Sequence, residues 1–537
     1  MRPTKVVLAF LSISCFACAG AKTTPGAPVA SDPPKGQPLP SPAWLADAVM
    51  YEAYTRSFAD SDGDGMGDLP GITGHLDHLR GAPDSLGVDA LWLTPIHPTD
   101  SDHGYDVKDY DHVAANLGGD AAFDALLAEA HKRGLKILLD GVFNHSSSRH
   151  PWFVASQDPN SPMRERYVWM DSDPVWPGLW GGSSWRRGSS GYYYGLFDNS
   201  MPDLNYRSPA TQDAIRQVVM GWLARGVDGF RLDAARYLVE NGPDGLADQP
   251  ETHAFWKSLR AEMVARYPEA VLIGEAWADA PTEEKYAGDG NELNAAFAFD
   301  LQSALSDGIL GEHPAKIHEA LAALAAAPPA FLAPFLSNHD QKRFAAFVKG
   351  DKAATFLGAK LLFALPGPVV VYYGEELGMQ GGKQQSDAAE RTPMQWTSTA
   401  NAGFSSAKPY RAVAGDAATT NVQAESVDPG SLLATYRQLI RARKSRTVLR
   451  TGSLTLLDVP APLLAFARGD GKDAVLCVFN LSASATTHAS LKWPGTIANG
   501  TSLTDLAHPE RPALTPSGST VELDIGPRGG SWIAIPN

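Results

Sequence analysis

The run GVDGFRLDAARY at residues 226–237 decides the fold, because it places two charges at the end of an apolar segment. Arg231 and Asp233 are two residues apart, so on a strand their side chains leave on the same face. Burying a charge is costly unless the charge is paired or used. The arginine can keep the aspartate ionised and oriented. We therefore predict a strand that ends in a functional site.

The same plan of helix, stop, strand and carboxylate recurs twice more. A helical apolar spacing over residues 119–134 precedes LKILL and Asp140, and a second helical pattern precedes AVLIG and Glu275. Further strand candidates are AVMYEAY, DALWLTPI, AAFAFDL, APFLSNHD and PVVVYYGEE. Eight parallel strands alternating with helices predict an α/β fold, the (β/α)8 TIM barrel, whose active site lies at the C-terminal strand ends. One carboxylate at such an end is often a helix cap or a structural ion pair, but several together indicate a site.

Asp233 and Glu275 suit glycoside hydrolysis with retention. That reaction needs two carboxyl groups about 5–5.5 Å apart, one attacking the sugar and one protonating the leaving oxygen. Because Arg231 is near Asp233, we expect the pKa of Asp233 to be lowered, as a nucleophile requires. Glu275 has no cation close in sequence, and an apolar setting favours the protonated form that a general acid needs.

Six ordered motifs resemble those of the α-amylase family of glycoside hydrolases (family thirteen), over roughly residues 42–537. They are LGVDALWLTPI, DGVFNH, GFRLDAARY, LIGEAW, FLSNHD and GPVVVYYGEE. The resemblance implies that Asp233 is the nucleophile, Glu275 the acid/base and Asp340 a third carboxylate that grips sugar hydroxyls. It also implies binding or positioning roles for four neighbours, with Tyr105 stacking on the sugar: Arg231, His145, His339 and Tyr105. Without the motifs, either histidine is typical of an ordinary core residue.

The acidic run DSDGDGMGDL at residues 60–69 predicts a calcium site. Ca²⁺ takes 6–8 oxygen ligands, and alternating carboxylates separated by glycines can fold around it. The candidate ligands are Asp60, Asp62, Asp64, Asp68 and the Met66 carbonyl. A solvated acidic turn is the alternative, and the family resemblance favours a structural Ca²⁺.

The ends of the chain differ in composition from its middle. A basic start followed by a short apolar run predicts an export signal, and Cys15 and Cys18 leave open whether the protein carries a lipid anchor. The expected parts are a signal (1–18), a Pro-rich tether (19–41), a barrel (42–145 and 206–448), an inserted domain B (146–205) and a C-terminal antiparallel β-sandwich (449–537). The expected location is periplasmic, secreted or, as a lipoprotein, at the outer membrane.

Charge and motifs together limit the substrate. The formal net charge is −15 and the chain has no long basic run, which argues against nucleic acid and is compatible with a neutral α-glucan or maltooligosaccharide. We expect a monomer.

MPDLN at 201–205 resembles a motif of a group between oligo-1,6-glucosidases and neopullulanases that contains exported α-amylases. The first interpretation is therefore an α-amylase, which cleaves α-1,4-glucosidic bonds with retention.

Two residues favour an alternative. In exo-acting α-glucosidases of the family, an aspartate and an arginine corresponding to Asp102 and Arg391 pair across the site and close it into a pocket. An exo-α-glucosidase, or a related transglycosylase or trehalose synthase, is thus the second interpretation. An inactive glycan-binding protein is the remote one, because Asp233, Glu275 and Asp340 are all present.

Overall fold

The computed structural model describes residues 36–382, 387–469, 473–493, 495–498 and 500–535. The expected export signal with Cys15 and Cys18, and most of the expected tether, lie outside the described residues. Residues Gln37–Asn537 form one compact unit. Within the described ranges, no helix is long and apolar enough to cross a membrane.

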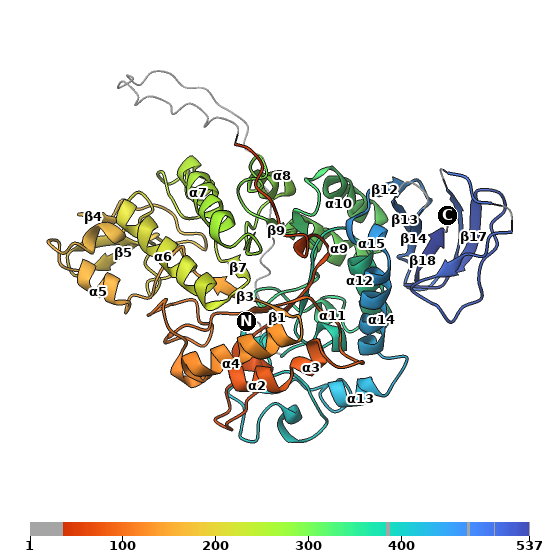
Figure 1. Cartoon of the computed structure of the whole chain (residues 1–537), viewed down its shortest axis with the longest axis horizontal. Helices are drawn as coiled ribbons and strands as arrows, with labels where there is room; N and C mark the ends of the chain where they lie inside the picture. The colour runs from red at the N-terminus through yellow and green to blue at the C-terminus, as the bar shows by residue number, and fades with distance from the viewer. Residues whose placement is uncertain (1–35, 383–386, 470–472, 494, 499, 536–537) are drawn as a thin grey trace, which may run out of the picture. The chain divides into compact units, whose positions relative to one another are not determined.

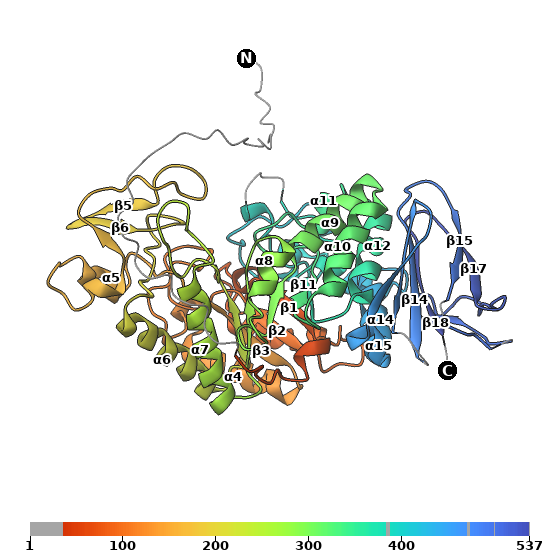
Figure 2. The ribbon, with the colours of Figure 1, turned by 90° about the horizontal axis from the view of Figure 1, so that it is seen from above.

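Eight parallel strands form a nearly closed barrel, so the predicted fold is confirmed (Figures 1 and 2). The strands are β1 (Val49–Ala53), β2 (Ala90–Leu93), β3 (Lys136–Gly141), β7 (Gly229–Leu232), β8 (Val271–Gly274), β9 (Ala295–Phe297), β10 (Leu332–Ala333) and β11 (Val369–Tyr372). Their order is β10-β9-β8-β7-β3-β2-β1-β11. Across the seam between β10 and β11, the Val370 N–H donates to the Pro334 carbonyl at 2.9 Å.

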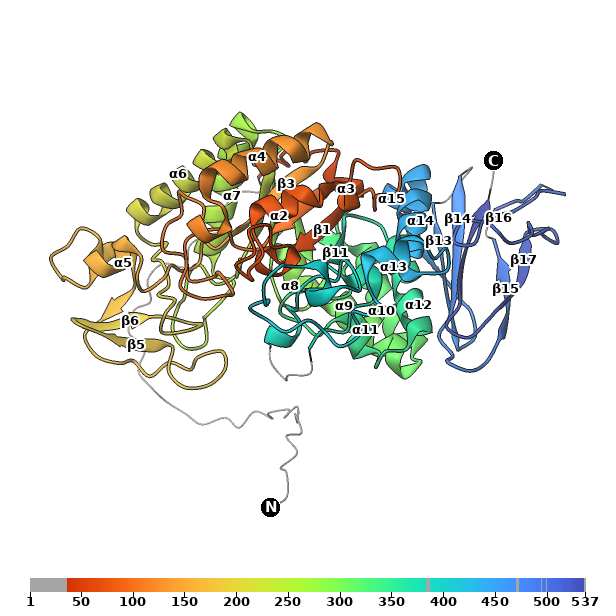
Figure 3. The ribbon, with the colours of Figure 1, turned by 90° about the horizontal axis from the view of Figure 1, so that it is seen from below.

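Helices surround the barrel, except α5 (Pro151–Ser156), which belongs to the insertion (Figure 3). The long ones are α4 (Gly119–Lys132), α6 (Pro209–Arg225), α7 (Pro250–Arg266), α9 (Phe299–Gly311), α10 (Pro314–Ala326), α12 (Lys352–Ala364) and α14 (Leu432–Ser445). The short ones are α1 (Thr55–Phe58), α2 (Leu69–Gly74), α3 (Leu76–Leu79), α5 (Pro151–Ser156), α8 (Ala280–Lys285), α11 (Phe344–Phe347), α13 (Val422–Ser426) and α15 (Thr447–Thr451).

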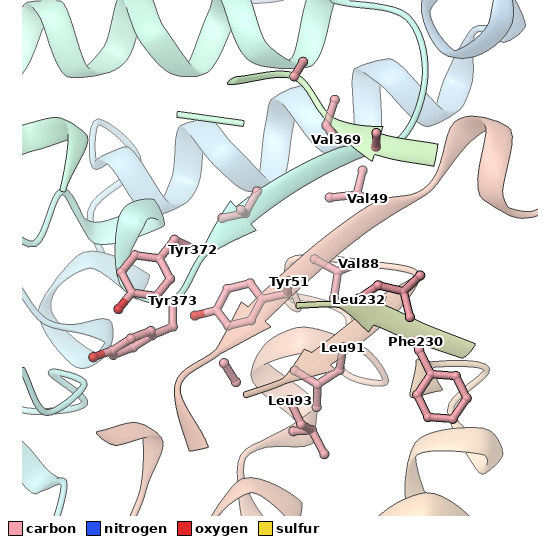
Figure 4. Packing of buried hydrophobic residues seen from close by; sticks show 14 of the residues in the cluster. Val49, Tyr51, Val88, Leu91, Leu93, Phe230, Leu232, Val369, Tyr372 and Tyr373 are labelled. Atoms are coloured by element: carbon pink, nitrogen blue, oxygen red, sulfur yellow. The ribbon is translucent and has the colours of Figure 1, made fainter. Parts of the chain in front are cut away.

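Successive residues of each barrel strand point alternately into the barrel and toward the helices, and so contribute to two apolar layers. Met50, Trp92 and Leu138 belong to one buried cluster, formed mainly by residues inside the barrel. Tyr51 and Leu91, each one position away on its strand, belong to the cluster between strands and helices, part of which Figure 4 shows. This period of two is what a strand requires when both of its faces are buried.

One predicted strand is shorter than expected. The segment AAFAFDL continues as a strand only to Phe297, and α9 begins at Phe299. The buried carboxylate of Glu283 accepts a hydrogen bond from the Phe299 N–H at 3.0 Å, satisfying a backbone donor at the start of the helix.

The insertion and the C-terminal region have sheets of their own. In the insertion, β4 (Trp169–Met170), β5 (Trp185–Gly188) and β6 (Gly191–Tyr194) form an antiparallel sheet in the order β4-β6-β5. The C-terminal strands are β12 (Leu454–Leu457), β13 (Leu463–Arg468), β14 (Ala474–Asn480), β15 (Thr487–Lys492), β16 (Thr504–Asp505), β17 (Thr520–Ile525) and β18 (Gly530–Ile535). They form a sheet β12-β13-β14-β18-β16 and a pair β15-β17, and both contribute to one apolar cluster. The domain boundaries themselves stay predictions.

Candidate active site

Arg231 lies at the centre of a group of carboxylates at the C-terminal ends of the strands. Its Nη1 donates to Asp140 Oδ1 at 2.9 Å and to Asp233 Oδ1 at 2.8 Å, and its Nη2 lies 2.7 Å from Glu275 Oε2. In the register of β3 and β7, Asp140 is opposite Arg231. The prediction that Arg231 and Asp233 leave their strand on the same face is confirmed.

The electrostatics of Asp233 differ from the expectation. Burial raises the pKa of Asp233 well above its usual 3.8; the Arg231 guanidinium opposes this, while nearby carboxylates, Glu275 foremost, add to it. The predicted lowering was therefore wrong, because the sequence shows the arginine neighbour but not the loss of water or the convergence of carboxylates. Glu275 has no cation close in sequence, as noted, but the fold brings Arg231 to it from another strand.

Asp340 enters the group from the loop after β10. Its Oδ1 lies 2.6 Å from Arg391 Nη2, and its Oδ2 lies 3.1 Å from His339 Nε2. Burial alone would raise the pKa of Asp340, but His339 and Arg391 outweigh it and hold that pKa well below its usual value. Asp340 is thus an anion at neutral pH.

His339 is held on both sides. Its Nδ1 lies 2.6 Å from Glu52 Oε1, and its Nε2 lies 2.6 Å from the Tyr105 hydroxyl. Burial opposes the charge of the ring, but Asp340 and Glu52 raise the pKa of His339 to about 10. The ring is therefore a cation at neutral pH. Sequence reasoning missed Glu52, which lies in no motif and is brought to His339 by the barrel.

Tyr105 and His145 lie beside this group as the motifs implied. The Tyr105 ring is parallel to the His339 ring, with centroids 5.5 Å apart, and its hydroxyl donates to Asp140 Oδ2 at 2.9 Å. His145 Nε2 lies 3.1 Å from the Tyr105 carbonyl oxygen. From the insertion, Phe197 contacts the His145 ring, and Trp180, which is 76% exposed, contacts Phe197. Aromatic side chains thus lead from the site to the surface.

The expected pairing of Asp102 with Arg391 was wrong. Arg391 binds Asp340, and its Nε donates to the His339 carbonyl at 2.8 Å. Asp102 instead forms an ion pair with Arg411, which follows β11 far along the chain. No sequence signal identified Arg411. Arg391 and Arg411 both follow β11, and only the fold decides which of them reaches Asp102 in the loop after β2.

The Asp102–Arg411 pair links two loops that follow strands of the barrel. Asp102 lies in the loop after β2 and Arg411 in the segment after β11, and β1 lies between those two strands. The pair therefore joins segments that follow the two strands on either side of β1. The Asp102 carbonyl also accepts a hydrogen bond at 2.8 Å from Tyr54, the residue that follows β1.

The acidic run near residue 60 gathers most of its predicted ligands. Asp60, Asp62 and Asp68 each place a carboxylate oxygen within 4.8 Å of the others, whereas Asp64 lies outside this group and accepts a hydrogen bond from the Met66 N–H at 2.7 Å. Three converging carboxylates suit a hard divalent cation, so the residues present fit Ca²⁺.

Known proteins resemble this chain over most of its length. Residues 52–452 match the family described as Alpha amylase, catalytic domain. Alpha-amylase 3 of Dictyoglomus thermophilum is 34% identical over 448 residues, which cover 82% of this chain and 85% of that protein. Trehalose synthase/amylase TreS of Mycolicibacterium smegmatis is 36% identical over 507 residues, covering 82% and 84%. A probable alpha-glucosidase of Rhizobium meliloti is 34% identical over 511 residues, covering 83% and 91%.

Solved structures give the same result. The crystal structure of an alpha-amylase from H. orenii superimposes with a TM-score of 0.81 at 31% identity, covering 91% of this chain and 99% of that one. The alpha-glucosyl transfer enzyme XgtA superimposes equally well, at 30% identity and with the same coverage. The barrel, the group of carboxylates and these similarities together show that the chain belongs to the α-amylase family (family thirteen) of glycoside hydrolases.

Proposed function

We propose that this enzyme is an exo-acting α-glucosidase that removes glucose from the ends of α-1,4-linked maltooligosaccharides with retention. The observation that carries this proposal is the Asp102–Arg411 ion pair between the segments that follow β2 and β11. A bridge at that place closes one side of the mouth. A sugar chain can then enter only with its terminal unit, so bonds inside a long chain are out of reach.

In the proposed mechanism, Asp233 attacks the anomeric carbon and Glu275 protonates the leaving oxygen. Both carboxylates bind one guanidinium, at 2.8 and 2.7 Å, which favours the separation of about 5–5.5 Å that retention uses. Because several carboxylates converge here, ionising all of them together is unfavourable. In this proposal Glu275 donates a proton to the leaving oxygen, while Arg231 keeps Asp233 oriented and in contact with positive charge.

The remaining groups hold the sugar. Asp340 is an anion and can accept hydrogen bonds from sugar hydroxyls. These hydrogen bonds are stronger inside the barrel than in water, because the local dielectric constant is lower. His339 positions Asp340 through its Nε2, and His145 positions Tyr105 through the contact with the Tyr105 carbonyl oxygen. Tyr105 offers its ring as a stacking surface. Arg391 keeps Asp340 in position through the contact at 2.6 Å.

An α-amylase that cleaves internal α-1,4 bonds is the second candidate. Two observations favour it: the MPDLN run, and the 47% exposure of the Asp102 side chain, which places the ion pair at the solvent boundary. Arg411 also lines a cavity of about 910 Å³ with Lys342, Thr392 and Asp416. If the pair opened, that cavity would give a longer chain somewhere to extend.

A time course of products from maltoheptaose and from maltose tests the proposal. Glucose as the first product from both substrates supports exo action. A mixture of maltooligosaccharides from maltoheptaose in the first minutes would instead establish the α-amylase. Trehalose as the main product from maltose would overturn hydrolysis as the principal reaction.

We also propose two features that lie apart from the chemistry. Asp60, Asp62 and Asp68 hold a structural Ca²⁺, supported by their convergence within 4.8 Å. The protein is exported, supported by the basic and then apolar composition of residues 1–18. Fractionation of producing cells, with labelling by a radioactive fatty acid, tests export and the lipid anchor.

A further inference from the structure

Glu52 is a buried acid inside the barrel to which no motif gives a role. It lies on β1, where its register partners are Trp92 on β2 and Tyr372 on β11, and it is 0% exposed. Its Oε1 lies 2.6 Å from His339 Nδ1, and its Oε2 has no hydrogen-bond partner within the described part of the chain. A buried carboxylate is costly unless a cation is paired with it, so the contact with His339 must offset that cost.

When Glu52 and Asp340 are both ionised, the surroundings of His339 favour protons on both ring nitrogens. Nδ1 faces the Glu52 carboxylate, and Nε2 faces the Asp340 carboxylate at 3.1 Å and the Tyr105 hydroxyl at 2.6 Å. The Tyr105 hydrogen is already donated to Asp140. A neutral imidazole has one N–H and would leave a bare nitrogen against a carboxylate, whereas the imidazolium donates from both nitrogens.

We propose that Glu52 is a positioning residue that keeps His339 doubly protonated and directs its Nε2–H toward Asp340 and Tyr105. The inference rests on the proposed function, because it assigns a purpose to the site that grips the sugar. A charged His339 gives a stronger hydrogen bond to Asp340 than a neutral one, and so holds more firmly the carboxylate proposed to grip the sugar. Glu52 reaches the substrate only through His339.

The balance of charge around His339 explains why Glu52 is needed. The side chains that face His339, or lie close to its partners, come from several elements; they are Glu52, Tyr54, Trp92, Tyr105, Asp140, Arg231, Asp340, Tyr372 and Arg391. Two of these are permanent cations, Arg231 and Arg391, and they disfavour a third positive charge. Glu52 is the carboxylate on the side of the ring away from Asp340, so it balances the charge at Nδ1.

The test replaces Glu52 without changing its shape. In E52Q the amide oxygen can still accept from Nδ1, but the negative charge is gone. The pKa of His339 should then fall by about one to three pH units. It is measured from the ring ¹⁵N shifts of histidine-labelled protein, in which H339Q identifies the signal of His339. The ratio of kcat/KM at pH 8.5 to that at pH 6, with maltose as substrate, should fall relative to wild type, by up to about thirtyfold for a fall of three pH units.

Glu376→Gln is the matched control. Glu376 is also 0% exposed, and its Oε1 also lies against a histidine nitrogen, His78 Nε2, at 2.9 Å, but it lies outside the carboxylate group. A general loss of packing would affect E52Q and E376Q alike, whereas the proposal changes the titration of His339 and the pH profile in E52Q alone. Equal changes in both variants, or unchanged titration of His339 in E52Q, would overturn it.

The wild-type protein keeps the inference testable even if E52Q does not fold. Its His339 should carry both ring protons at pH 7.5, and a neutral His339 there would overturn the inference. This readout needs no turnover. A wild type inactive on every α-glucoside, but with a charged His339, would therefore contradict the proposed function and leave the role of Glu52 standing.

Discussion

Replacing Arg231 by lysine tests whether one guanidinium must serve both catalytic carboxylates. Arg231 is 2% exposed and uses different amino groups, Nη1 for Asp233 and Nη2 for Glu275. A lysine keeps the charge but has one ammonium in place of the fork. It can remain near Asp140 and Asp233 and then loses the contact with Glu275.

The size of the effect follows from the lost contact. A hydrogen bond to a charged group contributes about 1.5–3 kcal/mol, so losing one corresponds to about a 10- to 150-fold loss in kcat/KM. Because the positive charge is retained, we expect R231K to fold and its melting temperature to fall only modestly. Initial rates with maltose, together with a thermal melt followed by circular dichroism, measure both quantities.

Arg236→Lys is the control for this experiment. Arg236 also binds a carboxylate with more than one nitrogen, Asp248, and its side chain is 16% exposed. It lies outside the carboxylate group, so R236K should change kcat/KM by no more than about threefold, in keeping with the small value of partly exposed ion pairs. If R231K kept more than half of the wild-type kcat/KM, or if R236K lost as much activity, the reasoning about the shared guanidinium would be refuted.

Four further predictions follow from the site and the acidic run. Asp233→Asn should lower kcat by at least about a thousandfold with an unchanged circular dichroism spectrum, and a variant that keeps more than a hundredth of the activity would argue against a covalent nucleophile. Because the pKa of Asp233 is raised above 3.8 and the nucleophile must be ionised, kcat/KM should fall as the pH drops toward an apparent pKa above that value; half-maximal activity below pH 3.8 would contradict it. Arg411→Ala should add longer maltooligosaccharides to the early products from maltoheptaose with a stability loss of no more than about 1 kcal/mol, and an unchanged product pattern would leave the ion pair without its proposed role. A chelator should remove about 2.7 kcal/mol of stability at a Ca²⁺ concentration one hundredfold above its Kd, and an identical melting curve with and without chelator would indicate a solvated turn.

Much of the site could be predicted because its residues follow strands. Asp140, Arg231, Asp233 and Glu275 each lie at or just after the end of an apolar run, and parallel strands in a barrel bring such ends together. The motifs added Asp340, whose strand is only two residues long. Apart from the Arg231–Asp233 contact, sequence reasoning could not supply the partners of the charges, because the other partners come from segments remote in sequence.

By itself, the sequence determined the alternation of helices and strands, the acids at the strand ends and the face on which Arg231 and Asp233 leave. Those are local properties, set by hydrophobic period and by the two-residue repeat of a strand. Only the tertiary structure decided that Arg411 rather than Arg391 reaches Asp102, that Glu275 shares Arg231, and that Glu52 holds His339. It also decided the direction of the Asp233 pKa, because desolvation and the convergence of carboxylates exist only once the barrel has closed around them.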